Sequence, residues 1–496
     1  MKDAIENIAV RRGFFWQASE IYGSISGLYD YAPIGTMLKR NWESLWRSYF
    51  IGLSDDFFEI ETTDIMPENV FVASGHLKNF TDPIVRCTKC GTTFRADHIL
   101  EDVLKESFEG LTPEEMTNLI KKHNLKCEKC SGALEDVGTL NMMFPLSIGV
   151  EKPATAYLRP ETAQGPYVNF KRTFEVMRKK LPLGLAVIGK AYRNEISPRN
   201  TLLRMREFTQ AELQIFFDPD KINEHERFDE VKDYPVRIFP VENRESGRID
   251  EVKISALTKK LPRFYLYHMA KMQQFYLDVL KLPKEKLRFR ELSDEERAFY
   301  NKYHYDVELQ LNIGWKEIAG LHYRTDHDLG GHQKISKQDM AINIDGKKFI
   351  PHVLELSFGV DRNILALLDV CYKEEKERAL FSFPRILSPF DCAVFPLVNK
   401  DRLPEKAIEI KEMLKKSGFS LFYDDSGSIG RRYRRMDEIG AAICITTDHR
   451  TLEDDTVTIR DRDSMKQVRV RAKDLDNTIK RFLQGEKMEN LGEIVK

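Results

Sequence analysis

Two runs of alternating residues between positions 183 and 217 constrain the fold more than any other feature of the chain. The first run, LGLAVIGKAYRNE (183–195), has the two-residue period of a β-strand. The second run, from about Arg204 to Phe217, has one apolar face and one unusually polar face. The polar face carries Arg206, Phe208, Gln210, Glu212 and Gln214. The runs predict a pair of strands that buries one face and presents polar groups on the other.

The polar face of this strand pair fits a nucleotide. Pairing of the two runs would place Arg193 and Glu195 across from Arg206 and Phe208. Guanidinium groups bind phosphate in a bidentate manner and stay charged. A Phe ring offers a stacking surface for a base, and Glu195 could accept from an exocyclic amine. The alternative is a solvated hairpin with cross-strand ion pairs, which is the commoner use of such residues.

A strand followed by a helix is predicted over 350–371, IPHVLELSFGVDRNILALLDVC. The strand places Glu355 and Ser357 on one face. Arg362 falls in the first turn of the helix, where the helix dipole disfavours a cation, and this suggests an anionic ligand. The segment RPETAQG (159–165) is, by itself, only a polar loop.

A helix is also predicted over 37–50, because its apolar residues recur on one face. That face carries Trp42 and Trp46. It fits either a helix that packs on the core or a subunit interface, since aromatic residues concentrate in interfaces.

Two C-x-x-C pairs stand out among seven cysteines, namely Cys87 with Cys90 and Cys127 with Cys130. Four thiolates suit a tetrahedral structural zinc ion and leave no open position for catalysis. The stretch between the pairs contains a capping box, Thr112 to Glu115, which predicts an inserted helix. The alternatives are a site without metal or a redox pair.

The formal net charge is only −1, from 77 basic and 78 acidic residues. Such a balance excludes a protein that coats nucleic acid or membrane by bulk attraction. There is no signal-like or membrane-spanning apolar run, so we expect a cytoplasmic protein without a membrane partner.

The chain divides into segments of different character. Residues 218–310 are rich in charge and read as an insertion that separates two parts of one larger domain, 1–217 and 311–380. The cysteine pairs mark a subdomain over 84–140. Strand-like and helical stretches alternate over 388–496, which predicts a small α/β domain.

Several segments together resemble the glycyl-tRNA synthetases of the archaeal and eukaryotic dimeric type, which are class II aminoacyl-tRNA synthetases. They are RRGFFWQASEIYGSISGLYDYAPIG, RPETAQGPYVNFKR, YRNEISPRN, LRMREFTQAE, GWKEIAG, PHVLELSFGVDR and TIRDRDSMKQVRV. The resemblance covers nearly the whole chain, apart from parts of 218–285. It implies an α+β fold, in which helices flank a class II antiparallel sheet and a C-terminal α/β anticodon-binding domain follows. It also implies a homodimer formed through the first motif, which includes the Trp42 and Trp46 helix.

The implied activity is that of a glycine–tRNA ligase. Such an enzyme activates glycine with ATP and Mg²⁺ to glycyl-adenylate and pyrophosphate, and then transfers glycine to the 3′ end of tRNA-Gly. The resemblance implies an ATP site formed by Arg193, Asn194, Glu195, Leu203, Arg204, Arg206, Phe208, Glu317, Ile318, Gly359 and Arg362. Of these, Arg193, Glu195 and Arg362 are the expected catalytic residues. Phe208 should stack on adenine, and Glu317 should be the carboxylate at Mg-ATP.

The resemblance also implies where the other substrates bind. The expected glycine-binding residues are Arg95, Glu161, Phe208, Gln210, Glu212, Glu355 and Ser357. The expected tRNA-binding residues are Arg431, Arg432, Tyr433 and Arg435, although a solvated basic helix would look the same. Carboxylates around the α-carbon would leave no room for a side chain and so would select glycine by exclusion.

The chain departs from the pattern of the family in three places. Residues 296–300 read ERAFY, residues 321–323 read LHY where many members have an Ala-Asp pair, and Leu356 stands where a proline is usual. The rival interpretations are a class II synthetase for serine, threonine, proline or histidine, and a synthetase-like protein without catalysis. RPETAQG, TQAE and the complete set of motif arginines favour the glycine enzyme over both.

Overall fold

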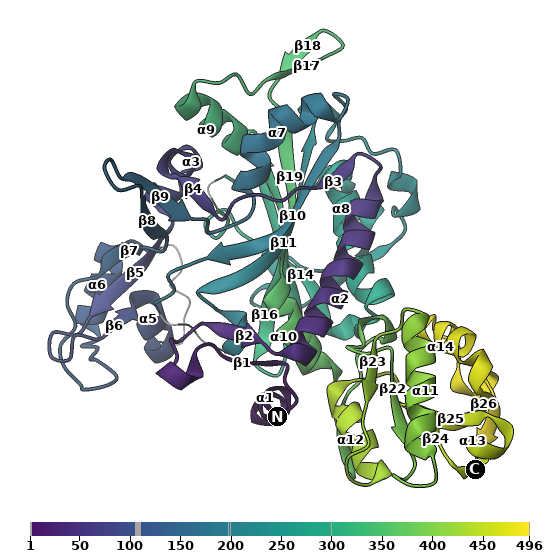
Figure 1. Cartoon of the computed structure of the whole chain (residues 1–496). Helices are drawn as coiled ribbons and strands as arrows, with labels where there is room; N and C mark the ends of the chain where they lie inside the picture. The colour runs from purple at the N-terminus through teal and green to yellow at the C-terminus, as the bar shows by residue number, and fades with distance from the viewer. Residues whose placement is uncertain (1, 105–110, 197, 199, 299, 496) are drawn as a thin grey trace.

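The computed structural model describes residues 2–104, 111–196, 198, 200–298 and 300–495 (Figure 1). A large mixed sheet forms the centre of the molecule. Its strands, in spatial order, are β13 (Asp250–Lys253), β12 (Pro235–Phe239), β14 (Leu287–Glu291), β15 (Tyr303–Leu311), β16 (Gly314–Thr325), β19 (His352–Gly359), β11 (Glu207–Phe217), β10 (Leu183–Tyr192) and β3 (Phe57–Glu59). Neighbouring strands run antiparallel, except for the parallel pairs β12 with β14 and β10 with β3.

The predicted strand pair of 183–217 is confirmed as β10 and β11. Ala191 lies opposite Phe208 in the antiparallel register, and the Arg193 amide donates to the carbonyl oxygen of Arg206. Ala211, Leu213 and Ile215 of β11 are fully buried on the apolar face. The polar face of β11 therefore looks away from this core, as the alternation predicts.

Three helices cover the apolar face of the sheet, α2 (Pro33–Phe50), α8 (Arg263–Gln274) and α10 (Val360–Cys371). Trp42 and Trp46 of α2 have no exposed surface and pack against Phe358 of β19. The interpretation of this tryptophan face as a subunit interface is therefore wrong, and the alternative of a core-facing helix is confirmed. Burial of two indoles against strand residues is a large apolar contribution to stability.

The opposite face of the sheet is only partly covered by helices. There α7 (Gln164–Val176) packs Tyr167 and Phe170 against Phe216 of β11, beside α9 (His327–Ser336) and α3 (Glu68–Ala73). Gln210, Glu212 and Gln214 share the face of Phe216 because side chains alternate along the strand. The uncovered end of this face holds the candidate site.

The charge-rich segment 218–310 is not a separate insertion. Its strands β12, β13, β14 and β15 extend the central sheet, and α8 contributes Phe264, Tyr265 and Leu266 to the same core. The predicted boundary of the catalytic domain at 217 and 311 is therefore wrong. The alternation is present in β15, where Tyr305, Val307 and Leu309 are buried with polar residues between them, but the high charge of the segment conceals it.

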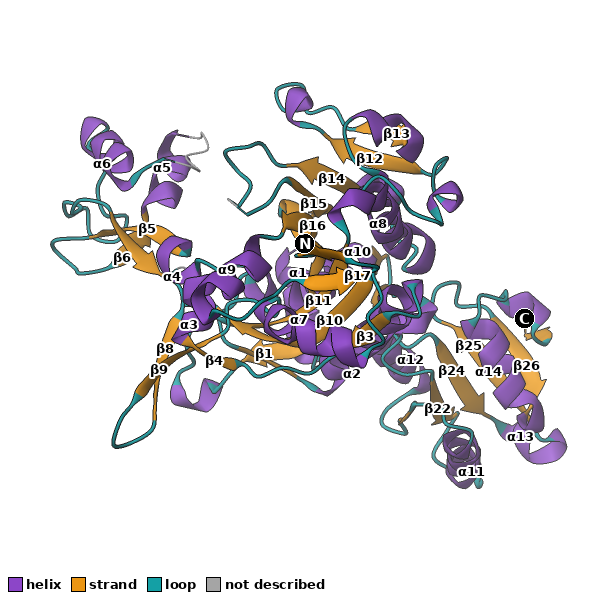
Figure 2. Ribbon diagram, turned by 90° about the horizontal axis from the view of Figure 1, so that it is seen from above, coloured by secondary structure: helices purple, strands orange, loops and turns teal. Residues whose placement is uncertain are grey.

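The cysteine pairs lie in a subdomain on the side of the central sheet away from the C-terminal domain (Figures 1 and 2). Its elements are β5 (Thr81–Arg86), β6 (Thr93–Arg95), α5 (Ala96–Leu104), α6 (Pro113–Lys122) and β7 (Gly138–Asn141). The predicted capping box is confirmed, because the Thr112 side chain accepts from the Glu115 amide at the start of α6.

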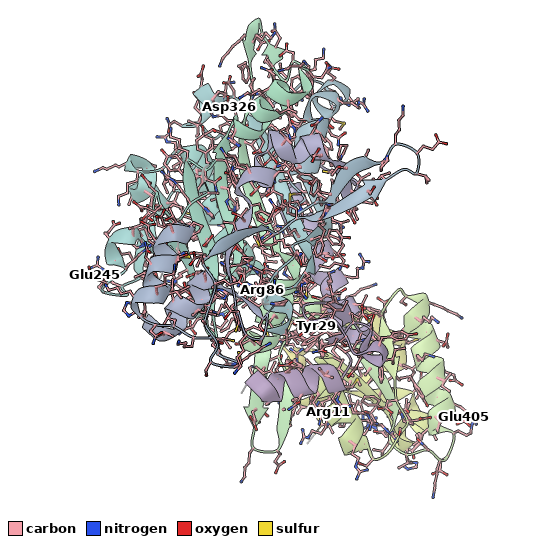
Figure 3. The ribbon with its side chains drawn as sticks, turned by 90° about the vertical axis from the view of Figure 1, so that its left-hand side faces the viewer. Arg11, Tyr29, Arg86, Glu245, Asp326 and Glu405 are labelled. Carbon is pink, nitrogen blue, oxygen red and sulfur yellow. The ribbon has the colours of Figure 1, made fainter. Side chains whose placement is uncertain are left out.

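The C-terminal domain has a sheet with the strand order β23 (Leu421–Tyr423), β22 (Cys392–Pro396), β24 (Ile443–Thr447), β25 (Thr456–Asp461), β26 (Gln467–Arg471) and β27 (Glu493–Val495). β22 runs parallel to both of its neighbours, and the other pairs are antiparallel. The helices are α11 (Leu403–Lys416), α12 (Ile429–Ile439), α13 (His449–Asp454) and α14 (Leu475–Leu483). The partly parallel α/β domain is confirmed. Figure 3 shows that α1 (Lys2–Arg11) lies beside this domain, where Arg11 pairs with Glu438 at 3.0 Å.

Smaller sheets complete the fold. They are formed by β1 (Phe15–Gln17) with β2 (Tyr29–Tyr31), by β4 (Ile65–Pro67), β9 (Ala154–Leu158) and β8 (Phe144–Ile148), by β17 (Ile342–Ile344) with β18 (Lys347–Phe349), and by β20 (Tyr372–Glu375) with β21 (Arg378–Phe381). Across the part of the chain that the structure describes, no helix combines the length and apolar character needed to cross a membrane.

Candidate active site

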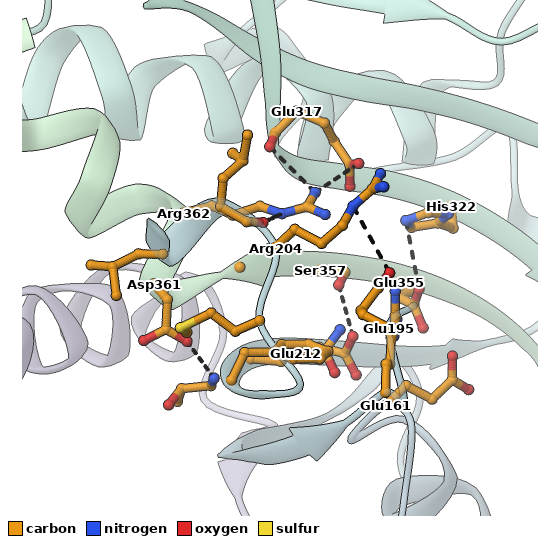
Figure 4. Close-up of a pocket in the computed structure, with 18 of the residues that line it drawn as sticks. Glu161, Glu195, Arg204, Glu212, Glu317, His322, Glu355, Ser357, Asp361 and Arg362 are labelled. Atoms are coloured by element: carbon orange, nitrogen blue, oxygen red, sulfur yellow. Dashed lines mark hydrogen bonds and ion pairs between the residues drawn. The ribbon is translucent and has the colours of Figure 1, made fainter. Parts of the chain in front are cut away.

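A cavity of about 160 Å³ opens on the polar face of the central sheet, over β11, β16 and β19 (Figure 4). It brings together most of the predicted substrate residues. Those that line it are Glu161, Arg193, Glu195, Leu203, Arg204, Phe208, Gln210, Glu212, Glu317, Glu355, Ser357, Gly359 and Arg362. They come from five separated segments of the chain, so the fold and not local sequence assembles the site.

One half of the cavity is rich in arginine. Arg362 Nη1 lies 2.8 Å from Glu317 Oε2. Burial opposes ionisation of Glu317, but Arg362 outweighs it and lowers the pKa of this carboxyl below its ordinary value. The Arg193 guanidinium lies between the rings of Phe80 and Phe208, 5.2 Å from each centroid. These cations and the Phe208 ring form a surface that suits a nucleoside phosphate.

Four predicted residues do not line this cavity. The Arg206 guanidinium donates to the carbonyl oxygens of Ser26 and Glu195, and Ile318 is fully buried. The backbone N–H of Asn194 donates to the Met142 carbonyl oxygen. Arg95 lies in the cysteine subdomain, where Asp82 and Asp97 bind its guanidinium. Contacts of these residues with substrates stay predictions.

The other half of the cavity is a pocket of buried carboxylates. Glu212 accepts hydrogen bonds from the hydroxyls of Thr162 (2.6 Å) and Ser357 (2.7 Å). Burial, together with the nearby charges of Glu355 and Glu161, raises the pKa of Glu212 to about 8. The negative charge of this group is therefore poorly compensated by the protein.

A buried arginine organises the remaining carboxylates. Arg324 Nη1 lies 3.0 Å from Glu355 Oε2, its Nε lies 2.8 Å from Asp328, and its Nη2 lies 3.4 Å from Glu161. Burial opposes ionisation of Glu161, but Arg324 and His76 outweigh it and lower its pKa well below the ordinary value. Burial and the charge of Glu161 raise the pKa of Glu355, against the effect of Arg324. Buried charges of this kind require close partners.

Sequence reasoning missed several residues of the pocket. Tyr300, His322 and Asp361 line the cavity, and the buried Arg324 contacts two of its carboxylates, Glu161 and Glu355. His322 and Arg324 share the β16 face that points to Glu355, and their alternation along the strand was the available signal. Of the departures from the family pattern, Tyr300 and His322 thus lie at the site, Leu356 is buried in the core, and Phe299 lies outside the described residues.

The four paired cysteines come together as predicted. Their Sγ atoms lie within 4.8 Å of one another, with 3.5 Å between Cys87 and Cys130 and 3.6 Å between Cys90 and Cys127. A tetrahedral zinc ion with Zn–S bonds of about 2.3 Å holds its sulfur atoms ~3.8 Å apart, so the cluster fits this ion. A Cβ at Gly132 would lie 2.9 Å from the Cys87 sulfur, which explains a glycine in the second knuckle.

A basic groove lies on α12 in the C-terminal domain. It is about 700 Å³ in volume and is lined by Arg431, Tyr433 and Arg435 together with Arg12, Arg434 and Arg460. The last three were not among the predicted residues. A groove with clustered arginines and an aromatic ring suits an RNA backbone with unstacked bases.

Arg432 does not belong to this groove, so its prediction as a tRNA contact is wrong. It is 2% exposed, and its guanidinium donates to the carbonyl oxygens of Pro396, Asp425 and Gly427. The reason is helical periodicity, because Arg432 shares the buried face of α12 with Met436 and Ile439.

Comparisons with known proteins agree with this geometry. Residues 149–371 match the family model of the tRNA synthetase class II core domain for G, H, P, S and T, and residues 391–482 match an anticodon binding domain. Both parts of the predicted fold class are thereby confirmed.

Relatives over the full length include proteins named glycine–tRNA ligase. The protein of Pyrococcus furiosus is 40% identical over 97% of this chain and 99% of its own length. That of Methanocaldococcus jannaschii is 39% identical over 97% and 99% of the two chains, and that of Aeropyrum pernix is 38% identical over 100% and 99%. With this identity over almost the whole of both chains, the protein belongs to the glycine–tRNA ligase family of class II aminoacyl-tRNA synthetases.

Proposed function

We propose that the protein activates glycine with ATP and transfers it to the 3′ end of tRNA-Gly. The observation that carries the proposal is the convergence of Glu161, Glu212 and Glu355 on one small cavity. Glu212 is held by two hydroxyls, and burial with the charges of Glu355 and Glu161 raises its pKa. The ammonium group of an amino acid is a cation that would compensate this cluster.

The pocket would select glycine by the absence of space. Glu161, Glu212 and Glu355 come from three segments and converge with Ser357 on the same small cavity. An ammonium held among these carboxylates would place the α-carbon against the sheet, so a larger amino acid could not enter. Selection by exclusion needs no second editing site, because no natural amino acid is smaller.

The arginine-rich half would take ATP. Arg193, Arg204 and Arg362 would hold the phosphates, and Phe208 would stack on adenine. A glycine carboxylate oxygen would form a bond to the α-phosphorus, and the bond to the bridging oxygen of pyrophosphate would break. Arg193 would stabilise the charge that grows on the α-phosphate. Glu195 would lie beside the ATP. Catalysis would thus consist of positioning and charge stabilisation.

Metal ions would assist in two places. Glu317 offers a carboxylate beside the arginines, and oxygen ligands of this type suit the Mg²⁺ that accompanies ATP and neutralises phosphate charge. The four cysteines fit Zn²⁺ with a structural role. Unpaired thiols of this kind require the reducing conditions of the predicted cytoplasmic location.

Transfer would require the tRNA to reach both domains. The basic groove of Arg431, Tyr433 and Arg435 would bind the anticodon region, while the 3′-terminal ribose hydroxyl attacks the glycyl carbonyl carbon and AMP leaves. We also propose a homodimer. Ile21, Tyr22 and Ile25, in the segment before α2, are 88%, 87% and 61% exposed, and a second copy would cover them.

The test is charging of tRNA-Gly transcripts with radiolabelled glycine by the purified protein. The proposal predicts acid-precipitable glycine that depends on ATP and Mg²⁺. Glycyl-adenylate formation without any transfer to tRNA would contradict the second half of the proposal.

A further inference from the structure

His322 of β16 lies directly opposite Glu355 of β19 and lines the cavity beside it (Figure 4). Its Nε2 atom is 3.7 Å from Glu355 Oε1. The other carboxylate oxygen, Oε2, accepts hydrogen bonds from Arg324 (3.0 Å) and Gln214 (2.8 Å). The two oxygens of Glu355 therefore face different surroundings, and Oε1 faces the imidazole.

A hydrogen-bond network sets the tautomer of His322. Asn301 Nδ2 lies 3.1 Å from His322 Nδ1 and 3.4 Å from His304 Nδ1. An amide nitrogen carries two hydrogens, so Asn301 can donate one to each ring. With His304 Nε2 as the donor to Asp306 at 2.9 Å, this arrangement assigns the proton of His322 to Nε2, toward Glu355.

The His322 ring is neutral in this environment. Burial and the nearby Arg324 cation lower its pKa well below the ordinary value, against the opposing effect of Glu161. A neutral imidazole with a fixed tautomer is a directed hydrogen-bond donor. It can orient a carboxylate without cancelling the negative charge that a substrate ammonium needs.

The ring also fills space that a substrate side chain would need. An ideal Cβ at Gly320 would lie 2.4 Å from His322 Nε2, so the imidazole lies across the backbone of Gly320. Gly320 is paired with Ser357 in the sheet. The ring therefore covers the sheet beside both Glu355 and Ser357.

We propose that His322 is a positioning residue for the amino-acid substrate, which directs Glu355 Oε1 toward the ammonium and closes the pocket against a side chain on the α-carbon. The inference rests on the proposed placement of glycine among Glu161, Glu212 and Glu355. It assigns a role to one of the positions at which the chain departs from the pattern of many family members.

Three substitutions separate the two parts of this role in the full-length protein. H322Q keeps a donor at a similar reach, H322L keeps the bulk without the donor, and H322A removes both. In glycine-dependent pyrophosphate exchange, H322Q should stay within about threefold of the parent in KM for glycine. H322L should raise that KM about tenfold or more, because it removes the polar ring nitrogen that lies 3.7 Å from the charged Glu355. The KM for ATP and kcat should not change.

H322A should, in addition, admit alanine. The ratio of kcat/KM for alanine to that for glycine should rise about tenfold or more, as expected when room for one methyl group is opened. G320A provides a second test, because its Cβ would displace the imidazole and should raise the KM for glycine as H322L does. In the H322A background the same substitution should cost little more, since the two changes act on one contact.

An unchanged KM for glycine in H322L and G320A, both with normal unfolding temperatures, would overturn the positioning role. An unchanged preference for glycine over alanine in H322A would overturn the closing role. E355Q distinguishes these failures from failure of the proposed function. If E355Q binds glycine as the parent does, glycine is not placed at Glu355. That result would contradict both the proposed glycine pocket and the role of His322.

Discussion

Ser357 and Glu212 face each other across the pair of strands β11 and β19, and the Ser357 hydroxyl donates a 2.7 Å hydrogen bond to the Glu212 carboxylate. This contact holds a carboxyl group of raised pKa at the floor of the pocket. The register of the two strands places Ser357 opposite Glu212, and it therefore decides which polar side chains converge in the pocket.

The raised pKa of Glu212 predicts a loss of stability at high pH. Its pKa rises from an ordinary value of 4.5 to about 8 on folding, so the folded protein holds the proton more tightly. The resulting stabilisation is complete below pH 4.5 and disappears as the pH rises through 8. Between pH 7 and 9 the free energy of unfolding should fall by about 1.4 kcal/mol from this group alone.

E212Q should lack this dependence, because the amide resembles the protonated acid and cannot ionise. The measurement is the free energy of unfolding of parent and variant at both pH values. E207Q, at a solvated position of the same strand, is the matched control and should keep the parent behaviour. Identical pH profiles for E212Q and the parent would show that Glu212 is ionised throughout.

The ion pair of Arg362 and Glu317 predicts a defect in ATP use. R362A should lower kcat/KM for ATP in pyrophosphate exchange by about 10²- to 10³-fold, because it removes a preorganised cation from the phosphate site. R248A, on the exposed surface, serves as the control. Equal activities of the two variants would place the triphosphate elsewhere.

The sulfur cluster predicts one bound zinc ion per chain. Elemental analysis of the purified protein should find it, and C90S should lose it and lower the unfolding temperature of the protein. C371S should retain the zinc ion, because Cys371 is buried in the catalytic core, even if it lowers stability. Full zinc content in C90S would contradict a four-thiolate site.

Arg431 and Arg432 are neighbours in sequence with opposite expected effects. R431A should leave pyrophosphate exchange unchanged and raise the KM for tRNA about tenfold, since it removes a contact in the basic groove. R432A should instead lower the free energy of unfolding by about 1–3 kcal/mol, because it leaves buried carbonyl oxygens without donors. Reversed phenotypes would mean that α12 presents its other face to RNA.

Local patterns were sufficient to predict the centre of the fold. The alternation over 183–217 identified β10 and β11, and the apolar spacing over 37–50 identified most of α2, because each pattern follows from the geometry of a single element. The strands of 218–310 were not predicted, because their many charged residues conceal the alternation that places Leu287 and Phe289 of β14 and Val307 of β15 in the core. Their place in the sheet is decided by tertiary packing.

In the candidate site, too, some residues could be predicted from local motifs and others could not. The motifs located Glu212, Glu355 and Arg362, which the structure brings into one cavity. Arg324 was missed because a charge inside a strand is understandable only with its partners from three other segments. Arg432 was misassigned because the run of arginines hid the helical period that buries it beside Met436.

The most direct test of the account is ATP–pyrophosphate exchange across a panel of amino acids that includes glycine, alanine and serine. The carboxylate pocket predicts exchange with glycine and at least about 100-fold lower kcat/KM with alanine, because each added group must be accommodated against a closed wall. Exchange with alanine or serine at a rate equal to that with glycine, or no exchange with any amino acid, would contradict it.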